Sequence, residues 1–218
     1  MSNKRINAIK TKFADERSGN IILLSHCLLN ENTRYFGGAF QRNFSKEILE
    51  QIHTKGYGII QLPCPEQKAW GGLQKPYLWL GIDNKKTIIY PFRHLIYRFF
   101  ILHTKRIYSK IANKTVKEIR DQMKAGYTVK GIIGIGGSPT CGVQTSLDIS
   151  RINEFANLKL NQLDRKSWND LIYTKFLQNK AGLFMKILQK KLRRRKTDLV
   201  FYEFDLQKEM NNEKQILL

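Results

Sequence analysis

The sequence predicts a single α/β domain of the Rossmann-like kind, in which helices flank a mostly parallel sheet. Three observations predict this class. Short apolar runs alternate with helical patterns, each run ends in turn-forming residues, and a chain of 218 residues suits one compact domain better than two. Strands that alternate with helices imply right-handed crossovers, which place the strands parallel to one another.

Four short apolar runs are predicted to form buried strands. β-branched residues recur in each run, and turn-forming residues follow it. The runs cover residues 21–25, 57–62, 129–135 and 199–204.

Three helical patterns lie between these strands. They cover residues 44–55 after Asn43, residues 91 to about 124, which could contain a break, and residues 167 to about 195. The stretch 67–128 is longer than one crossover requires. We therefore expect it to contain an insertion or lid followed by a basic helix, within a single domain that covers residues 1–218.

The helix predicted in the second half of this insertion is basic and amphipathic. Apolar residues recur at helical spacing beside Lys and Arg, which predicts a core-facing stripe and a solvated charged face. A helix that binds RNA or lies on a membrane surface would have the same pattern. The stripe consists of Phe92, Ile96, Phe99, Ile107 and Ile111, and the basic residues are Arg93, Arg98, Lys105, Arg106 and Lys110.

The composition indicates a folded, cytoplasmic protein that attracts polyanions. Hydrophobic residues make up 42% of the chain, the N-terminal segment lacks the apolar core of a signal peptide, and no stretch has the roughly 20 apolar residues of a membrane span. A formal net charge of +20 would attract tRNA or another polyanion. Because lysine supplies most of the basic residues, a biased genome is an alternative explanation of this charge.

The three cysteines are expected to meet in one site. Thiols stay reduced in the cytoplasm, so an odd number of scattered cysteines does not predict disulfides. Cys27, Cys64 and Cys141 each follow one of the first three predicted strands, in loops that contain Gly or Pro. The carboxyl ends of parallel strands form the crevice where ligands bind, so these loops should lie close together.

Three thiols with glycine-rich surroundings favour a metal centre over plain packing. Thiolates select zinc, copper(I) or iron–sulfur clusters, and a structural zinc ion requires four protein ligands. His26 could supply a fourth ligand, although adjacent residues rarely face the same metal. A cubane cluster held by three thiolates instead leaves one iron open as a Lewis acid, which suits catalysis.

The residues around the cysteines resemble the thiouracil desulfidase family, including its relatives with His before the first cysteine. The similar segments are SHCLLN followed by RYFGG, PCPE followed by GGL, and GIIGIGGSPTCGV. The resemblance runs from Ile21 to about Ile149 and does not cover the C-terminal third. It implies a 4Fe-4S cluster bound by Cys27, Cys64 and Cys141, whose open iron takes the sulfur of a thiolated substrate before water replaces it.

The resemblance also implies catalytic roles for Glu66 and Ser138. Near a thiolate-ligated cluster, like charges and partial burial disfavour the ionised form of a carboxyl group, which would suit Glu66 to proton transfer. Ser138 could hydrogen-bond the substrate ring or activate water, although Ser before Pro is also a common turn residue.

The sequence departs from the best-known members beside the expected substrate pocket. His26 replaces a small residue, and the segment after Glu66 is aromatic and basic. His26, Asn30 and Arg34 flank Cys27 and are candidate substrate-binding residues. Because of these departures, the resemblance does not identify the thiolated nucleobase, nucleoside or related compound.

Two further functions remain open. The net charge and the arginines at 193–195 would suit an RNA-binding module with a structural metal. A desulfidase that acts on thiolated tRNA would combine both functions, and Trp70, Tyr77 or Trp79 could stack on an exposed base unless they pack in the core. A cluster carrier or redox protein is a weaker alternative, because an open iron beside an acid favours chemistry.

Overall fold

A parallel sheet forms the centre of the protein in the computed structural model, which describes residues 3–35, 37–40, 42, 45–80, 90–151, 154, 162–211 and 213–218. Its four strands have the order β2-β1-β3-β6 and all pair in parallel. The predicted α/β class with a parallel sheet is confirmed, and each predicted strand lies where the sequence places it. The strands are β1 (Asn20–Leu24), β2 (Gly58–Gln61), β3 (Thr128–Ile135) and β6 (Phe201–Phe204).

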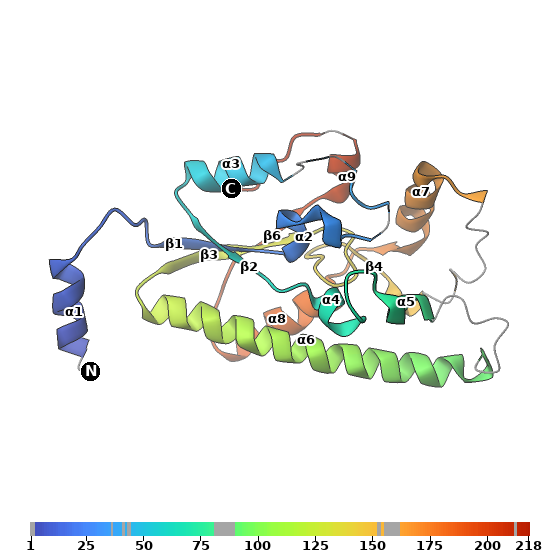
Figure 1. Cartoon of the computed structure of the whole chain (residues 1–218), viewed down its shortest axis with the longest axis horizontal. Helices are drawn as coiled ribbons and strands as arrows, with labels where there is room; N and C mark the ends of the chain where they lie inside the picture. Colours follow the sequence, from blue (N-terminus) through green and yellow to red (C-terminus); the bar gives the residue numbers. More distant parts are fainter. Residues whose placement is uncertain are drawn as a thin grey trace.

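The two inner strands are apolar because helices cover both faces of the sheet. Leu23 and Leu24 of β1 and Ile132 and Ile133 of β3 are fully buried. Above the sheet in Figure 1 lies α3 (Lys46–Thr54), and below it lie α6 (Arg93–Lys124) and α8 (Leu183–Arg194).

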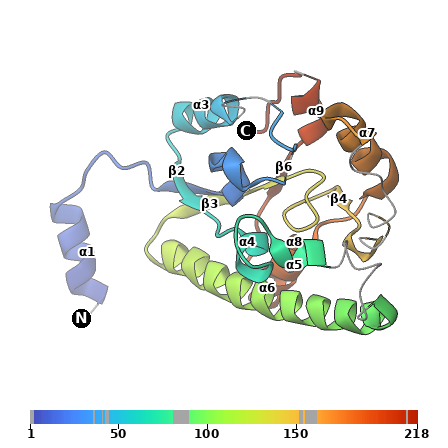
Figure 2. The ribbon, with the colours of Figure 1, turned by 45° about the vertical axis from the view of Figure 1, so that its right-hand side comes forward.

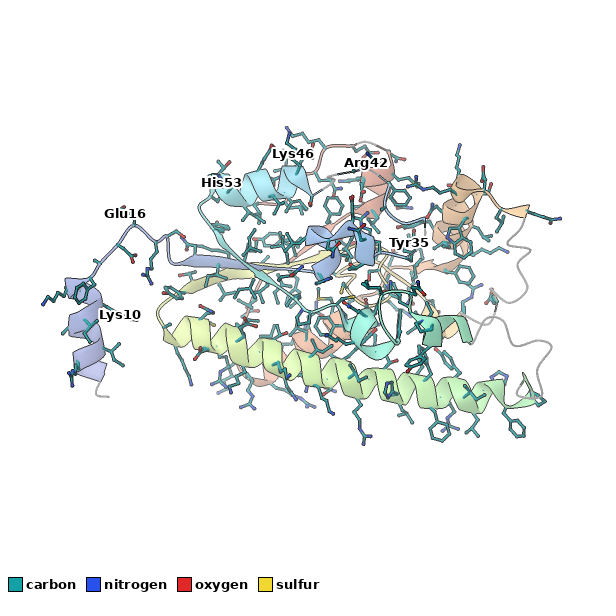
Figure 3. The ribbon with its side chains drawn as sticks, viewed as in Figure 1. Lys10, Glu16, Tyr35, Arg42, Lys46 and His53 are labelled. Carbon is teal, nitrogen blue, oxygen red and sulfur yellow. The ribbon has the colours of Figure 1, made fainter. Side chains whose placement is uncertain are left out.

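Helix α3 shows how an amphipathic sequence produces this covering. Ile48 and Ile52 are almost completely buried, whereas Lys46 and His53 point away from the sheet (Figure 3). Ile48 and Ile52 are four residues apart and therefore lie on one face of the helix, whereas Lys46 and His53 lie on the opposite side. The helix predicted over residues 44–55 is therefore observed from residue 46, and residues 43 and 44 lie outside the described residues.

The long helix α6 is continuous, so the break considered for residues 91–124 is absent from it. Its second half packs on the sheet, and Tyr108, Ala112 and Ile119 are fully buried there. Its first half extends past the carboxyl end of the sheet (Figures 1 and 2), where Thr104 is buried and Phe100 packs against the core.

The predicted core-facing stripe of α6 is therefore wrong for the first half of the helix. Ile111 is buried and Ile107 packs against the core, but Phe92, Ile96 and Phe99 are 59%, 41% and 63% exposed. The apolar spacing alone could not show where the sheet ends beneath the helix. The predicted insertion over residues 67–128 thus consists largely of α6 itself, and residues 81–89 within it lie outside the described residues.

The single helix predicted over residues 167–195 is two helices, α7 (Arg165–Phe176) and α8. Between them β5 (Leu177–Gln178) pairs antiparallel with β4 (Ser146–Leu147). Gly182 precedes α8, and a Cβ there would lie 2.6 Å from the backbone of Thr140. The close approach of this turn to the loop after β3 explains why the helix cannot continue through it.

Short helical elements and one peripheral helix complete the described chain. Helix α1 (Asn3–Lys12) stands apart from the body in Figures 1 and 2. Across the described ranges, no helix combines the length and the apolar character that a membrane crossing requires. The short elements are α2 (His26–Leu29), η1 (Glu31–Thr33), α4 (Pro65–Ala69), α5 (Pro76–Leu80), η3 (Tyr90–Phe92) and α9 (Leu206–Met210).

Candidate functional site

A cavity of about 140 Å³ lies at the carboxyl end of the sheet and is lined by Cys27, Cys64 and Cys141. Cys27 lies in α2, which follows β1, Cys64 precedes α4 after β2, and Cys141 lies in the loop after β3. Strand β1 has β2 on one side and β3 on the other, which makes this the point where the strand order reverses and where ligands bind in open α/β sheets. The three thiols therefore share one cavity, as their positions in the sequence predict.

Local hydrogen bonds fix two of the cysteines. The sulfur of Cys64 accepts the backbone N–H of Gln67 at 3.4 Å and so caps the start of α4. The backbone N–H of Cys141 donates to the hydroxyl oxygen of Ser138 at 3.0 Å.

The loop that carries Cys141 is held by a carboxylate that sequence reasoning missed. Glu203, on β6, accepts the backbone N–H groups of Val143, Gln144 and Thr145 at 2.6, 2.6 and 3.1 Å, and the Thr145 hydroxyl at 2.8 Å. Successive N–H groups around one anion form a rigid backbone nest. An acidic residue in a predicted strand is the only sequence signal of this contact, and it does not identify the partner.

Glycine is required on both sides of this loop. A Cβ at Gly134 would collide with the carbonyl oxygen of Cys141, and one at Gly142 would collide with the carbonyl oxygen of Thr145. The glycine-rich sequence around Cys141 therefore allows two backbone segments to approach each other closely.

The surroundings of all three cysteines disfavour the deprotonated, thiolate form. Burial raises the pKa of Cys27 to about 12, where Arg34 and Lys75 oppose the shift and Cys64 and Glu66 add to it. Burial also raises the pKa of Cys64 and, more strongly, that of Cys141, with the neighbouring thiols adding to the shift at Cys141. A cation that binds here would have to displace thiol protons, which is the usual coupling between metal binding and deprotonation.

Glu66 lies at the wall of the cavity in an ion pair that the sequence did not reveal. One carboxylate oxygen lies 2.5 Å from the ammonium nitrogen of Lys75, and the other accepts the hydroxyl of Thr140 at 2.7 Å. Burial alone would lower the pKa of Lys75, but Glu66 and the nearby thiols outweigh it and raise that pKa. Lys75 therefore places a positive charge beside Glu66, which opposes the negative charge that nearby thiolates would bring.

No sequence feature marks Lys75 as a buried residue. It lies three residues after Gly72 and directly before a proline, as an exposed turn residue could, yet it is 5% exposed. Its φ of +53° lies in the left-handed region, which is costly for a residue with a side chain.

Ser138 shapes the loop rather than pointing at an open space. Its hydroxyl oxygen accepts the backbone N–H groups of Thr140 and Cys141 and lies 3.1 Å from the hydroxyl oxygen of Thr140. Because the Thr140 hydroxyl donates to Glu66, Ser138 can donate to Thr140. Ser138, Thr140, Glu66 and Lys75 thus form one connected hydrogen-bond chain along the cavity.

Two of the three candidate substrate-binding residues line the cavity. His26 lines it with a pKa lowered by burial and by Lys68. Arg34 also lines it and donates to Glu209 in a buried ion pair at 2.9 Å. Asn30 is not among the described lining residues, and its side-chain oxygen instead accepts the backbone N–H of Asn32 and caps η1.

The aromatic stacking candidates differ in their exposure. Trp70 is 1% exposed, packs against Phe100, and donates its indole N–H to the hydroxyl of Thr104 on α6 at 3.2 Å. It is a core residue that also borders the cavity, so base stacking on its face is unsupported. Tyr77 is 51% exposed, and the side chain of Trp79 lies outside the described residues.

The three cysteines supply the soft sulfur donors that an iron–sulfur cluster requires. Among the described residues, no three His, Cys, Asp or Glu side chains are arranged to hold one metal ion. In an iron–sulfur cubane each thiolate binds a different iron, so its ligands surround the cluster and need not converge on one point. A donor set of three thiols around a mostly apolar cavity is chemically suited to that role.

The chain is similar to an uncharacterized protein from Methanocaldococcus jannaschii. The two are 28% identical over 123 residues, which cover 56% of this chain and 67% of that protein. No protein-family model and no solved structure matches the chain.

Proposed function

We propose that the protein is an iron–sulfur-dependent desulfidase that removes sulfur from a thiolated nucleobase, nucleoside or similar thiocarbonyl compound. The observation that carries this proposal is the shared cavity, in which three thiols from the ends of three parallel strands meet a buried carboxylate. Cys27, Cys64 and Cys141 would hold a 4Fe-4S cluster. With three protein ligands, such a cluster would supply one open iron that binds the substrate sulfur as a Lewis acid.

The overall reaction is a hydrolysis. The C=S group becomes C=O, water supplies the oxygen atom, and the sulfur leaves as hydrogen sulfide with the two protons of that water. No net oxidation or reduction occurs, so the reaction needs no further reactant.

Glu66 is the proposed base for the attacking water. Thr140 and Lys75 each bind one of its oxygens, which fixes the plane of the carboxylate at the cavity wall. Lys75 also offsets the negative charge that thiolates would bring to the cavity, because its ammonium group is buried beside them. Ser138 positions this carboxylate through Thr140 and supports the loop of Cys141.

The cavity wall suits a planar ring. Most of its surface comes from apolar groups, including Leu78, Ile149 and Phe176. Such walls exclude water from the reacting atoms and strengthen the electrostatic contacts inside. His26 and Arg34 are the polar residues of this wall that we propose contact the substrate.

Sulfide release from 2-thiouracil by protein reconstituted anaerobically with iron and sulfide tests the proposal. Replacing Glu66 by Gln should lower kcat by about 10²–10⁴, the usual contribution of a general base, while the bound iron stays constant. Glu50→Gln is the matched control, since Glu50 is an exposed residue of α3 with a 64% exposed side chain. Full activity of the Glu66→Gln variant, or of any Cys→Ser variant at the three positions, would refute the proposal.

A further inference from the structure

A second, strongly basic groove lies between α6 and α8. Its volume is about 500 Å³, and it is lined by Asn113, Val116, Asp121 and six cationic side chains. The six are Lys117, Arg120 and Lys124 of α6, and Lys191, Arg194 and Arg195 at the end of α8. This groove is separate from the cysteine cavity, with which it shares no lining residue.

Among the described residues, positive charges in the groove outnumber negative ones by six to one. None of the ion pairs found in the described ranges includes a groove cation, and Asp121 is the only acidic residue in the lining. Basic residues at helix C-termini stabilise the helix dipole, but this effect is confined to the last turn. Lys117 and Arg120 lie before the last turn of α6, so the dipole does not explain them.

The lining favours a phosphate backbone over other anionic partners. Of the described residues that line it, Val116 is the only apolar one, and none is aromatic. A membrane-binding helix or a protein interface would need apolar anchors at its centre. Cations on two walls of a concave surface instead fit a ridge of phosphates, which Lys and Arg bind directly.

We propose that this groove binds the phosphodiester backbone of RNA. Lys117 and Lys124 are seven residues apart on α6 and therefore about 10 Å apart along its axis, which lets them contact different phosphates of one strand. Lys117, the first cation of the groove along α6, lies about 14 Å along the helix axis from Tyr108, which is buried near the cysteines. A bound strand could thus reach past the groove towards the cavity.

The choice of RNA over DNA rests on the proposed function, because a thiolated base carried on RNA would bring its phosphates with it. The groove itself is derived from its own charges and shape. RNA binding in the groove and desulfidase activity can therefore be tested by separate measurements.

The experiment measures binding of unmodified tRNA by the full chain, with and without reconstitution, from 50 to 300 mM KCl. The test variant is K117Q/R120Q/K124Q. The control is R98Q/K105Q/K110Q, which removes two Lys and one Arg from exposed positions on the same helix, outside the groove. Thermal unfolding of both variants verifies that they fold.

The wild-type protein should lose affinity steeply with salt, with a log–log slope of about 4 to 5 for six phosphate contacts. The test variant should lower that slope by about 2 to 3 and weaken binding at least about tenfold, while the control should bind nearly as the wild type does. Equal losses in both variants, a flat salt response, or a preference for duplex DNA of the same length would overturn the proposal. Sulfide release from free 2-thiouracil should be the same in the groove variant as in the wild type, which separates the groove from the chemistry.

Discussion

Lys75 and Glu66 form a buried ion pair beside the three cysteines, and the energetics of such a pair are asymmetric. Their side chains are 7% and 11% exposed. Bringing two charges out of water costs several kcal/mol, so the pair adds little net stability, but removing one partner leaves the other charge uncompensated. The pair therefore makes the site sensitive to changes at either residue.

Replacing Lys75 by Met should lower the free energy of unfolding by about 3 kcal/mol, because the Glu66 carboxylate loses its partner. Met preserves the length of the side chain and the same backbone strain. Urea unfolding measures the effect, with Lys68→Met as a control at an exposed position. Adding Glu66→Gln to Lys75→Met should restore part of the loss, and strict additivity of the two changes would contradict the ion pair.

This effect should not depend on pH near neutrality. The folded-state pKa of Lys75 is raised above its ordinary value. Stability from a raised lysine pKa is fully present below the unfolded-state pKa of about 10.4 and is lost as the pH rises through the folded-state pKa. The destabilisation by Lys75→Met should thus be constant between about pH 7 and pH 9 and shrink only in stronger alkali.

Glu203 stabilises backbone rather than another side-chain charge, because it orders the loop that carries Cys141. Replacing it by Gln keeps the shape but removes the charge that three backbone N–H groups share. We expect a loss of about 1.5–3 kcal/mol, the range for hydrogen bonds to charged groups, and faster amide hydrogen exchange at residues 143–145. Asp198→Asn, an exposed change just before β6, should alter neither quantity. Unchanged exchange in the Glu203→Gln variant would show that the loop holds its shape without the carboxylate.

At the scale of elements, α6 combines a second half that packs on the sheet with a first half that exposes several large apolar side chains. Ile119 is fully buried, whereas Phe99 is 63% exposed. Removing buried methyl groups lowers the free energy of unfolding, because their favourable transfer from water is lost and a cavity remains. A surface substitution usually changes stability little. Apolar residues occur at helical spacing in both halves of α6, so this spacing does not show which half packs on the sheet.

The two halves can be compared directly by mutation. Ile119→Ala should lower the free energy of unfolding by about 2–5 kcal/mol. Phe99→Ser should change it by less than about 0.5 kcal/mol, because little packing is lost. Urea denaturation of both variants measures the difference, and a loss above about 1.5 kcal/mol for Phe99→Ser would mean that the first half of α6 is covered in solution.

At the scale of the whole molecule, the sheet was predictable because its two inner strands, β1 and β3, are largely buried. Runs such as Ile21–Leu24 and Ile132–Ile135 contain little but apolar residues, which leaves few alternatives. The site at the carboxyl ends of the strands followed from the same topology. The interruption between α7 and α8 was missed because it depends on the approach of Gly182 to Thr140, a contact between distant parts of the chain.

The residues around the cysteines were only partly predictable, because several of them reach the site through contacts between distant parts of the chain. Glu66 follows Cys64 closely in the sequence, so its place at the cavity could be inferred. Lys75, Thr140 and Glu203 reach the site through tertiary contacts that no local pattern records. The side chain of Asn30 caps η1, a local role that its proximity to Cys27 in the sequence did not indicate.

The central claim is that three cysteines from three strand ends hold one iron–sulfur cluster that binds a thiocarbonyl sulfur. The most direct measurement is the EPR and absorption spectrum of the anaerobically reconstituted protein, with and without 2-thiouracil. The account predicts brown protein with about four irons per chain, a cluster signal that 2-thiouracil changes, and loss of that signal when Cys27, Cys64 or Cys141 is replaced by Ser. Colourless protein, or a signal that persists through all three replacements, would contradict it.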